Sequence, residues 1–129
     1  MHAPEKLMNL QIATRVKDAA TVMDVAGRVT IENAPEFLNA LMQVVKVDKP
    51  PRLVVNMTAV SYIDSAGAAC LVEALKVSRD LKIGFALYGL GPVARDVLEL
   101  TRLTTVFEIY DTEDEALRGV RSASSSVRT

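Results

Sequence analysis

The serine hydroxyl in the run Asp64-Ser65-Ala66-Gly67 is the side chain whose position in this sequence best suits regulated chemistry. The β-branched run of residues 53–57 predicts a central strand before it, and Ser65 opens a predicted helix. A hydroxyl at a helix start can cap the helix, and it also lies where a phosphate would meet unpaired N–H groups. Position alone favours the cap. The small residues 66–69 carry nothing large enough to shield Ser65, and this favours an exposed docking surface.

A second pattern is the run of residues 89–94, which matches the G-x-G-x-x-A form of a dinucleotide-binding turn and is followed by Asp111 about twenty residues later. That turn belongs to the first strand–helix unit of a larger doubly wound sheet, whereas only one short strand and one helix are predicted after it here. We therefore interpret the run as a glycine turn before a helix that begins at Pro92, and we expect no bound cofactor.

The other reactive side chains are better explained by packing and capping. Cys70 lies between apolar residues of a predicted helix, so we expect it in the core. Four acidic residues surround the start of the last predicted helix, where the helix dipole favours negative charge, so we expect a capped, solvated helix start and no metal site. These residues are Asp111, Glu113, Asp114 and Glu115. One cysteine and one histidine, His2, cannot form a usual zinc site or a serine protease triad.

The composition limits the classes of protein to which the chain can belong. A chain of 129 residues and 14.0 kDa corresponds to one domain, and an apolar content of 50% excludes a disordered chain. The formal charge of -1 provides no basic surface for nucleic acid or for an anionic membrane. The most apolar stretch, Gly67 to Leu75, is interrupted by Glu73 and is shorter than the ~20 residues of a membrane span. We expect a cytoplasmic protein that neither enters a membrane nor contacts nucleic acid directly.

The predicted elements alternate between strand and helix from Leu53 onward, which indicates parallel pairing with right-handed crossovers. Strands are predicted at residues 10–16, 21–26, 53–57, 83–88 and 106–109, with Gly27 ending the second and a loop over 58–64. Helices are predicted after a cap at Asn33, from Ser65, at 92–100 and at 113–120. The result is an α/β single domain over residues 1–121, a mixed sheet of about five strands with about four helices, followed by a loose tail at 122–129.

The segment from Val54 to Gly67 resembles the STAS domain family, in particular the bacterial anti-sigma factor antagonists, whose signature is Asp-Ser-(Ser, Thr or Ala)-Gly after a strand and loop. The resemblance extends to residues 25–29, 88–89 and 93–103, and it covers roughly residues 8 to 120. It implies the STAS fold. Two positions differ from many members: Thr30 replaces an acidic residue, and Ala68-Ala69 replaces Leu-Gly after the motif glycine.

In that family the serine after the aspartate is phosphorylated by a partner, an anti-sigma factor that is itself an ATP-dependent serine kinase. The resemblance therefore implies that Ser65 is a phosphorylation site and that the unphosphorylated protein binds this kinase and frees a sigma factor. Transcription is then regulated indirectly by a protein that is not an enzyme. The expected partner-binding surface has Asp64, Ala66, Gly67 and Ala68 at its centre and Thr30 and Glu32 at its edge.

Two alternatives stay open at this point. A STAS adaptor or scaffold subunit without a switch, in a phospholipid transport complex or a stress-signalling assembly, would keep the fold and could keep the hydroxyl. A serine that only caps its helix would have no regulatory role. We also consider a weak homodimer.

Overall fold

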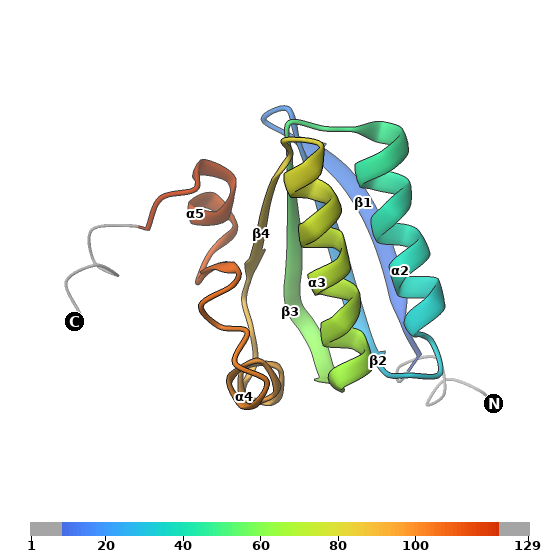
Figure 1. Ribbon diagram of the computed structural model, residues 1–129. Helices are drawn as coiled ribbons and strands as arrows, with labels where there is room; N and C mark the ends of the chain where they lie inside the picture. Colours follow the sequence, from blue (N-terminus) through green and yellow to red (C-terminus); the bar gives the residue numbers. More distant parts are fainter. Residues whose placement is uncertain (1–8, 122–129) are drawn as a thin grey trace.

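The computed structural model describes residues 9–121, which build one mixed sheet with helices on both of its faces (Figure 1). The strand order is β1-β2-β3-β4-β5. β1 and β2 form an antiparallel hairpin, and every later neighbour pair is parallel. The strands are β1 (Gln11–Lys17), β2 (Ala20–Val29), β3 (Arg52–Ile63), β4 (Gly84–Tyr88) and β5 (Glu108–Tyr110). The predicted mixed α/β sheet is confirmed.

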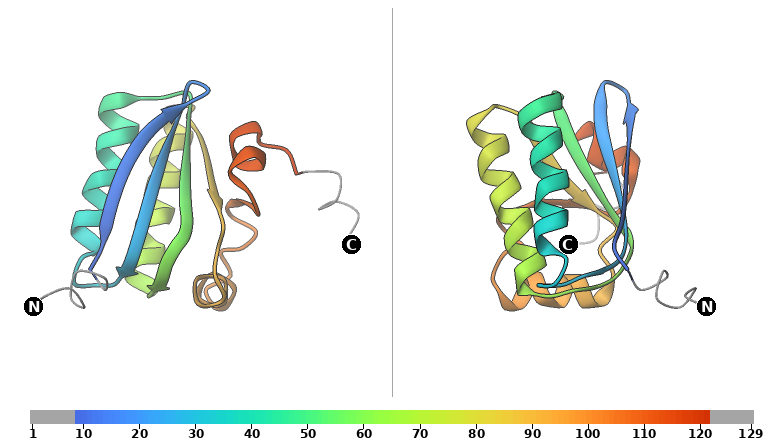
Figure 2. Two further views of the ribbon diagram at one scale, coloured as in Figure 1. Left: turned by 180° about the vertical axis from the view of Figure 1, so that it is seen from behind. Right: turned by 90° about the vertical axis from the view of Figure 1, so that its right-hand side faces the viewer.

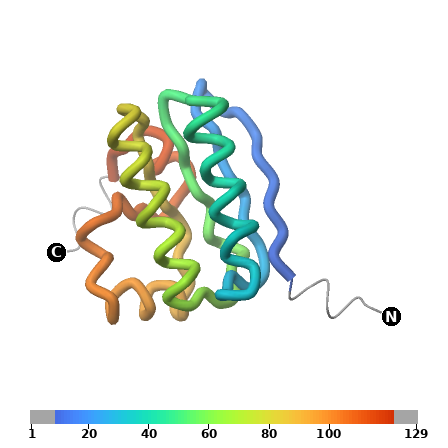
Figure 3. Tube along the Cα trace, turned by 45° about the vertical axis from the view of Figure 1, so that its right-hand side comes forward, coloured from blue at the N-terminus to red at the C-terminus, as the bar shows by residue number. Residues whose placement is uncertain are grey.

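The helices cover the two faces unequally. The first helix and its π-helical continuation lie beside α3 on one face, as the tube in Figure 3 shows, and α5 lies on the other face (Figure 2). The helices are α2 (Ala34–Met42) with the π-helical turn η1 (Gln43–Asp48), α3 (Ser65–Asp80), α4 (Pro92–Leu100) and α5 (Glu113–Arg118). None of the helices within residues 9–121 is long and apolar enough to cross a membrane.

Strand β3 is apolar on both faces because each face is covered by a helix. Leu53 and Val55 belong to the main core with Phe37 of α2 and Leu71 of α3. Val54, which points the other way, belongs to a smaller cluster under α5. Burial of each such side chain contributes ~1.5–3 kcal/mol, so the alternating faces of one strand hold both helical layers.

Two strands run further than the sequence predicts. β2 continues through Gly27 to Val29, and β3 continues to Ile63, so the predictions that Gly27 ends a strand and that residues 58–64 form a loop are wrong. Gly27 instead takes a φ of +95° inside β2, next to register shifts in which β3 carries one extra residue each time, which is the pattern of β-bulges in β3. The extra residues break the apolar–polar alternation of the second half of β3, so periodicity did not reveal that this strand continues.

Asn33 lies at the predicted start of α2, but its side chain does not cap that helix. Its amide nitrogen donates to the carbonyl of Arg28 at 2.9 Å, and its oxygen accepts from the N–H of Thr30 at 2.9 Å. The side chain thus closes the turn between β2 and α2, and the predicted cap is wrong. The predicted tail, residues 122–129, and His2 lie outside the described residues.

An ion-pair network holds α5 against the sheet. Glu113 accepts from Arg15 of β1 at 2.5 Å and from the Tyr88 hydroxyl at 2.8 Å, and Lys17 lies 3.2 Å away. The Arg15 guanidinium lowers the pKa of Glu113 to about 2, and desolvation raises the pKa of Tyr88 to about 12. The helix is capped as expected, because the Thr112 hydroxyl accepts from the N–H of Glu115. The expectation that its acids are solvated is wrong for Glu115, which is buried.

Substitution Gly27→Ala should lower the free energy of unfolding by ~2 kcal/mol or more, because a side chain strains this φ and its Cβ would lie 2.1 Å from the Asn9 carbonyl oxygen. Urea unfolding with an unchanged m-value measures the loss. Gly91→Ala is the matched control, since its Cβ meets nothing within 4 Å, and it should cost less than about 1 kcal/mol. Equal midpoints for the two variants would contradict a requirement for glycine at position 27.

Glu113→Gln should lower the free energy of unfolding by ~1–2 kcal/mol at pH 7, a value reduced for partial solvent exposure. The pKa of Glu113 lies below its ordinary value of 4.5, so its contribution is complete above that pH and is lost as the pH falls toward about 2. The difference between wild type and variant should therefore shrink over this range. Asp114→Asn, which removes only an exposed pair with Arg118, should cost less than ~0.5 kcal/mol. A difference that stays constant down to pH 2 would refute the assignment.

Candidate functional site

The candidate site lies at the edge of the sheet where β2 and β3 end and α2 and α3 begin, at the lower end of Figure 1. The two strand ends are tied together, since the N–H of Asp64 donates to the carbonyl of Val29 at 3.1 Å. Ser65 is the first residue of α3 and is exposed. The parallel strands therefore bring the serine and the β2–α2 turn to one edge, as the sequence predicts for Ser65.

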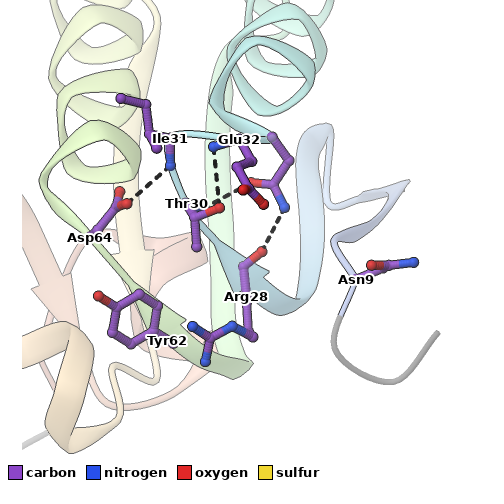
Figure 4. Close-up of a pocket in the computed structure, with 8 residues that line it drawn as sticks. Asn9, Arg28, Thr30, Ile31, Glu32, Tyr62 and Asp64 are labelled. Carbon is purple, nitrogen blue, oxygen red and sulfur yellow. Dashed lines mark hydrogen bonds between the residues drawn. The ribbon is translucent and has the colours of Figure 1, made fainter. Parts of the chain in front are cut away.

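The carboxylate of Asp64 makes two backbone contacts that organise this edge. One oxygen accepts from the N–H of Gly67 at 3.0 Å and so caps α3, with Asp64 in the extended conformation of an N-cap residue. The other oxygen accepts from the N–H of Ile31 at 3.0 Å, in the turn between β2 and α2 (Figure 4). One side chain thereby fixes a helix start and a turn that is 33 residues away in sequence.

Ser65 does not cap the helix. Asp64 occupies that position, and no residue within 9–121 forms a hydrogen bond with the Ser65 hydroxyl. The alternative in which the serine only caps α3 is therefore wrong. The hydroxyl is exposed at a helix N-terminus and is left unused by the fold.

Two of the predicted contact residues lie inside the protein. Ala68 is 1% exposed, and a Cβ on Gly67 would lie 2.6 Å from Ile63 Cγ1 and 2.8 Å from Val29 Cγ1. The prediction that Gly67 and Ala68 form the exposed centre of a docking surface is wrong, because the helical repeat turns them toward the sheet with the rest of the buried face. The accessible residues of this turn are Ser65, Ala66 and Ala69, of which Ala66 is half-buried.

The turn before α2 is held by its own polar groups. The N–H of Glu32 donates to the Thr30 hydroxyl at 3.3 Å. The N–H of Thr30 donates to the Asn33 side chain, and the N–H of Ile31 donates to the Asp64 carboxylate. The side chain of Ile31 is left 72% exposed beside the start of α3. A fixed turn that carries an exposed isoleucine suits contact with a protein surface, because little order is lost on binding.

An open hollow of about 440 Å³ runs along this edge. Its lining includes the three predicted residues Thr30, Glu32 and Asp64, together with residues that the sequence reasoning missed. The missed residues are Asn9, Arg28, Ile31, Asn33 and Tyr62. The guanidinium carbon of Arg28 lies 4.4 Å from the centroid of the Tyr62 ring. The polar turn residue Asn33 offered a signal, but nothing in the pattern marked Arg28 and Tyr62 as partners.

The other sequence candidates have structural roles. Cys70 is buried, and desolvation raises the pKa of its thiol, so the prediction of a core cysteine is confirmed. Gly89 has a φ of +75°, its Cβ would lie 2.2 Å from Thr58 Cγ2, and α4 begins at Pro92, which confirms the glycine turn. Within residues 9–121, no three His, Cys, Asp or Glu side chains are grouped so that they could hold a metal ion.

Asp64→Ala should lower the free energy of unfolding by ~1–2 kcal/mol, because the variant loses the cap of α3 and the bond to the β2–α2 turn. Hydrogen exchange should show lost protection at the amides of both Gly67 and Ile31. Ser65→Ala is the matched control and should leave both amides protected, since its hydroxyl bonds to nothing in the described chain. Unchanged exchange at Ile31 in the Asp64 variant would contradict the bridging role.

Several known proteins resemble this chain in sequence and in fold. The chain is 32% identical over 109 residues to the anti-sigma-B factor antagonist of Listeria monocytogenes, and the match covers 84% of this chain and 95% of that protein. The crystal structure of an anti-sigma factor antagonist from Mycobacterium paratuberculosis superposes with a TM-score of 0.77 at 30% identity, covering 87% of this chain and 94% of the other. Phosphorylated SpoIIAA of Bacillus, at 16% identity, shares the fold with a TM-score of 0.64 over 86% of this chain and 98% of its own.

The family model for the STAS domain matches residues 11–116, which include all five strands and the Ser65 edge. Together with the close match in sequence and architecture, this extent shows that the chain belongs to the STAS domain family.

Proposed function

We propose that this protein is an anti-sigma factor antagonist that is switched by phosphorylation of Ser65. The unphosphorylated protein binds an anti-sigma factor through the edge around Ser65, and the ATP-dependent serine kinase activity of that partner phosphorylates the hydroxyl and ends the complex. The protein acts in the cytoplasm as a binding module without enzymatic activity, and it changes transcription only through the sigma factor that it frees. The observation that carries the proposal is the exposed Ser65 hydroxyl, which the fold itself does not use.

A phosphate on Ser65 should change the stability of the fold only slightly. A phosphoserine carries about -1.5 to -2 charges, and a negative charge at an exposed helix N-terminus gains about 0.3–1 kcal/mol. The neighbouring carboxylate of Asp64 repels the phosphate, but both of its oxygens already accept backbone N–H groups. These terms partly offset one another, so the switch does not need a change of fold.

The binding surface responds much more strongly to the same charge. Glu32 and Asp64 line the hollow beside Ser65, and Arg28 is the single cationic side chain among its lining residues. A partner surface that fits a neutral hydroxyl would have to bury a dianion next to two carboxylates. Desolvation of an insufficiently paired charge costs several kcal/mol, which is enough to dissociate a complex of moderate affinity.

Ser65→Glu should bind the anti-sigma factor at least about tenfold more weakly, a loss of ~1.4 kcal/mol or more, with a near-native melting temperature. Ser65→Ala should bind like wild type and should take up no phosphate. Titration calorimetry against each purified anti-sigma factor of the same organism measures the first effect. Intact-mass measurement and peptide mapping after incubation with the factor and ATP measure the second.

Thr105→Glu is the matched control, because it places the same side chain on an exposed site in the loop before β5. Its affinity should stay within about twofold of wild type, a change below ~0.5 kcal/mol. Phosphate on another residue, or equal affinity for Ser65→Glu and wild type, would reject the switch. A STAS adaptor without a switch would then be the better explanation.

A further inference from the structure

Arg28 and Tyr62 form a stacked pair on the face of the sheet opposite α3. The two residues pair in the β2–β3 register, and their neighbours Val29 and Ile63 point into the core under α3. Since side chains alternate along a strand, Arg28 and Tyr62 point to the other face. Figure 4 shows the guanidinium beside the Tyr62 ring, below the turn that carries Ile31.

The stack orients the guanidinium, and no group within residues 9–121 accepts from its N–H groups. Within residues 9–121, the Arg28 side chain has no hydrogen bond or ion pair, and its interaction is the ring contact at 4.4 Å. Arg15 and Arg52, by contrast, are bound to carboxylates. A guanidinium that is half-buried and oriented by a ring presents a planar fork of donors, and the geometry of this fork matches a carboxylate.

The two carboxylates that line the hollow form no ion pair with this guanidinium. Asp64 accepts from two backbone N–H groups, and neither it nor the exposed Glu32 comes within the 4.0 Å of an ion pair with Arg28. The charge of the hollow still limits its ligand. Any anion there meets one cation and two carboxylates, so a dianionic phosphate is repelled more strongly than a single carboxylate, which needs only the one guanidinium fork.

We propose that the hollow receives an aspartate or glutamate side chain of the anti-sigma factor, which is bound by the Arg28 guanidinium on its Tyr62 support. This inference rests on the proposed function. The hollow lies next to the Ser65 position, because Asp64 lines it and directly precedes the serine. The bound partner thus extends from the first turn of α3 across the edge of the sheet to its second face, and Arg28 selects among partners.

The test measures the affinity of charge variants for each purified anti-sigma factor of the same organism. Arg28→Glu should bind at least about thirtyfold more weakly, or ~2 kcal/mol at 1.4 kcal/mol per tenfold. Arg28→Lys keeps the charge without the fork and should lose about three- to tenfold. Arg79→Glu makes the same charge change at an exposed position near the far end of α3, and its affinity should change less than about twofold.

Salt dependence separates an ionic contact from a structural effect. Wild-type affinity should fall as NaCl rises, and Arg28→Gln should show both a flatter salt dependence and an affinity about tenfold weaker at low salt. Circular dichroism checks the fold, and Arg28→Gln replaces the glutamate variant if that variant unfolds. Wild-type affinity and salt dependence in the Arg28 variants would overturn this inference and leave the proposed function standing. Failure of wild type to bind any of the factors would overturn the proposed function, and this inference with it.

Discussion

The carboxylate of Asp64 sets the geometry on which the candidate site depends. It caps α3 through Gly67 and holds the turn before α2 through Ile31, so two crossover connections are fixed relative to one another by one side chain. Because Asp64 is the N-cap, Ser65 becomes the first helical residue, and its hydroxyl has no hydrogen bond to any of residues 9–121. The order Asp-Ser therefore separates two roles that a single serine would otherwise have to combine, and it leaves the hydroxyl free to be modified without loss of the cap.

The sheet topology explains why the site lies at this edge. β2, β3 and β4 are parallel neighbours, so their connections to helices leave from the same edge and bring residues distant in sequence together. The other end of the fold is occupied differently: α5 is held on the second face by Glu113 and Arg15 and covers Val54. The face near the carboxyl ends of β2 and β3 is left to Arg28 and Tyr62, which is why the hollow can open there.

Much of the fold could be predicted from the sequence, because aliphatic runs and proline-started helices are local signals. The position of Ser65 at a helix start after a central strand is one such signal. The burial of Gly67 and Ala68 had a local signal too, since Leu71 and Leu75 follow them at helical spacing on one face, but the small residues 66–69 were interpreted as an exposed surface and these two were placed on the wrong side. The register shifts beside Gly27 and the bonds of Asn33, by contrast, depend on contacts between β2 and β3 and with the end of β2 that no local pattern contains.

The same long-range origin explains why the Arg28–Tyr62 pair escaped detection, although it contributes the cation of the site. Each residue is unremarkable in its own strand, and their contact exists only because two register shifts bring Arg28 opposite Tyr62. If the Thr21–Leu53 pairing continued without these shifts, Arg28 would lie opposite a residue of β3 two positions before Tyr62. The extra residues of β3 thus have a consequence at the edge of the sheet: they bring a cation and an aromatic ring together at the hollow beside a serine that the fold leaves exposed.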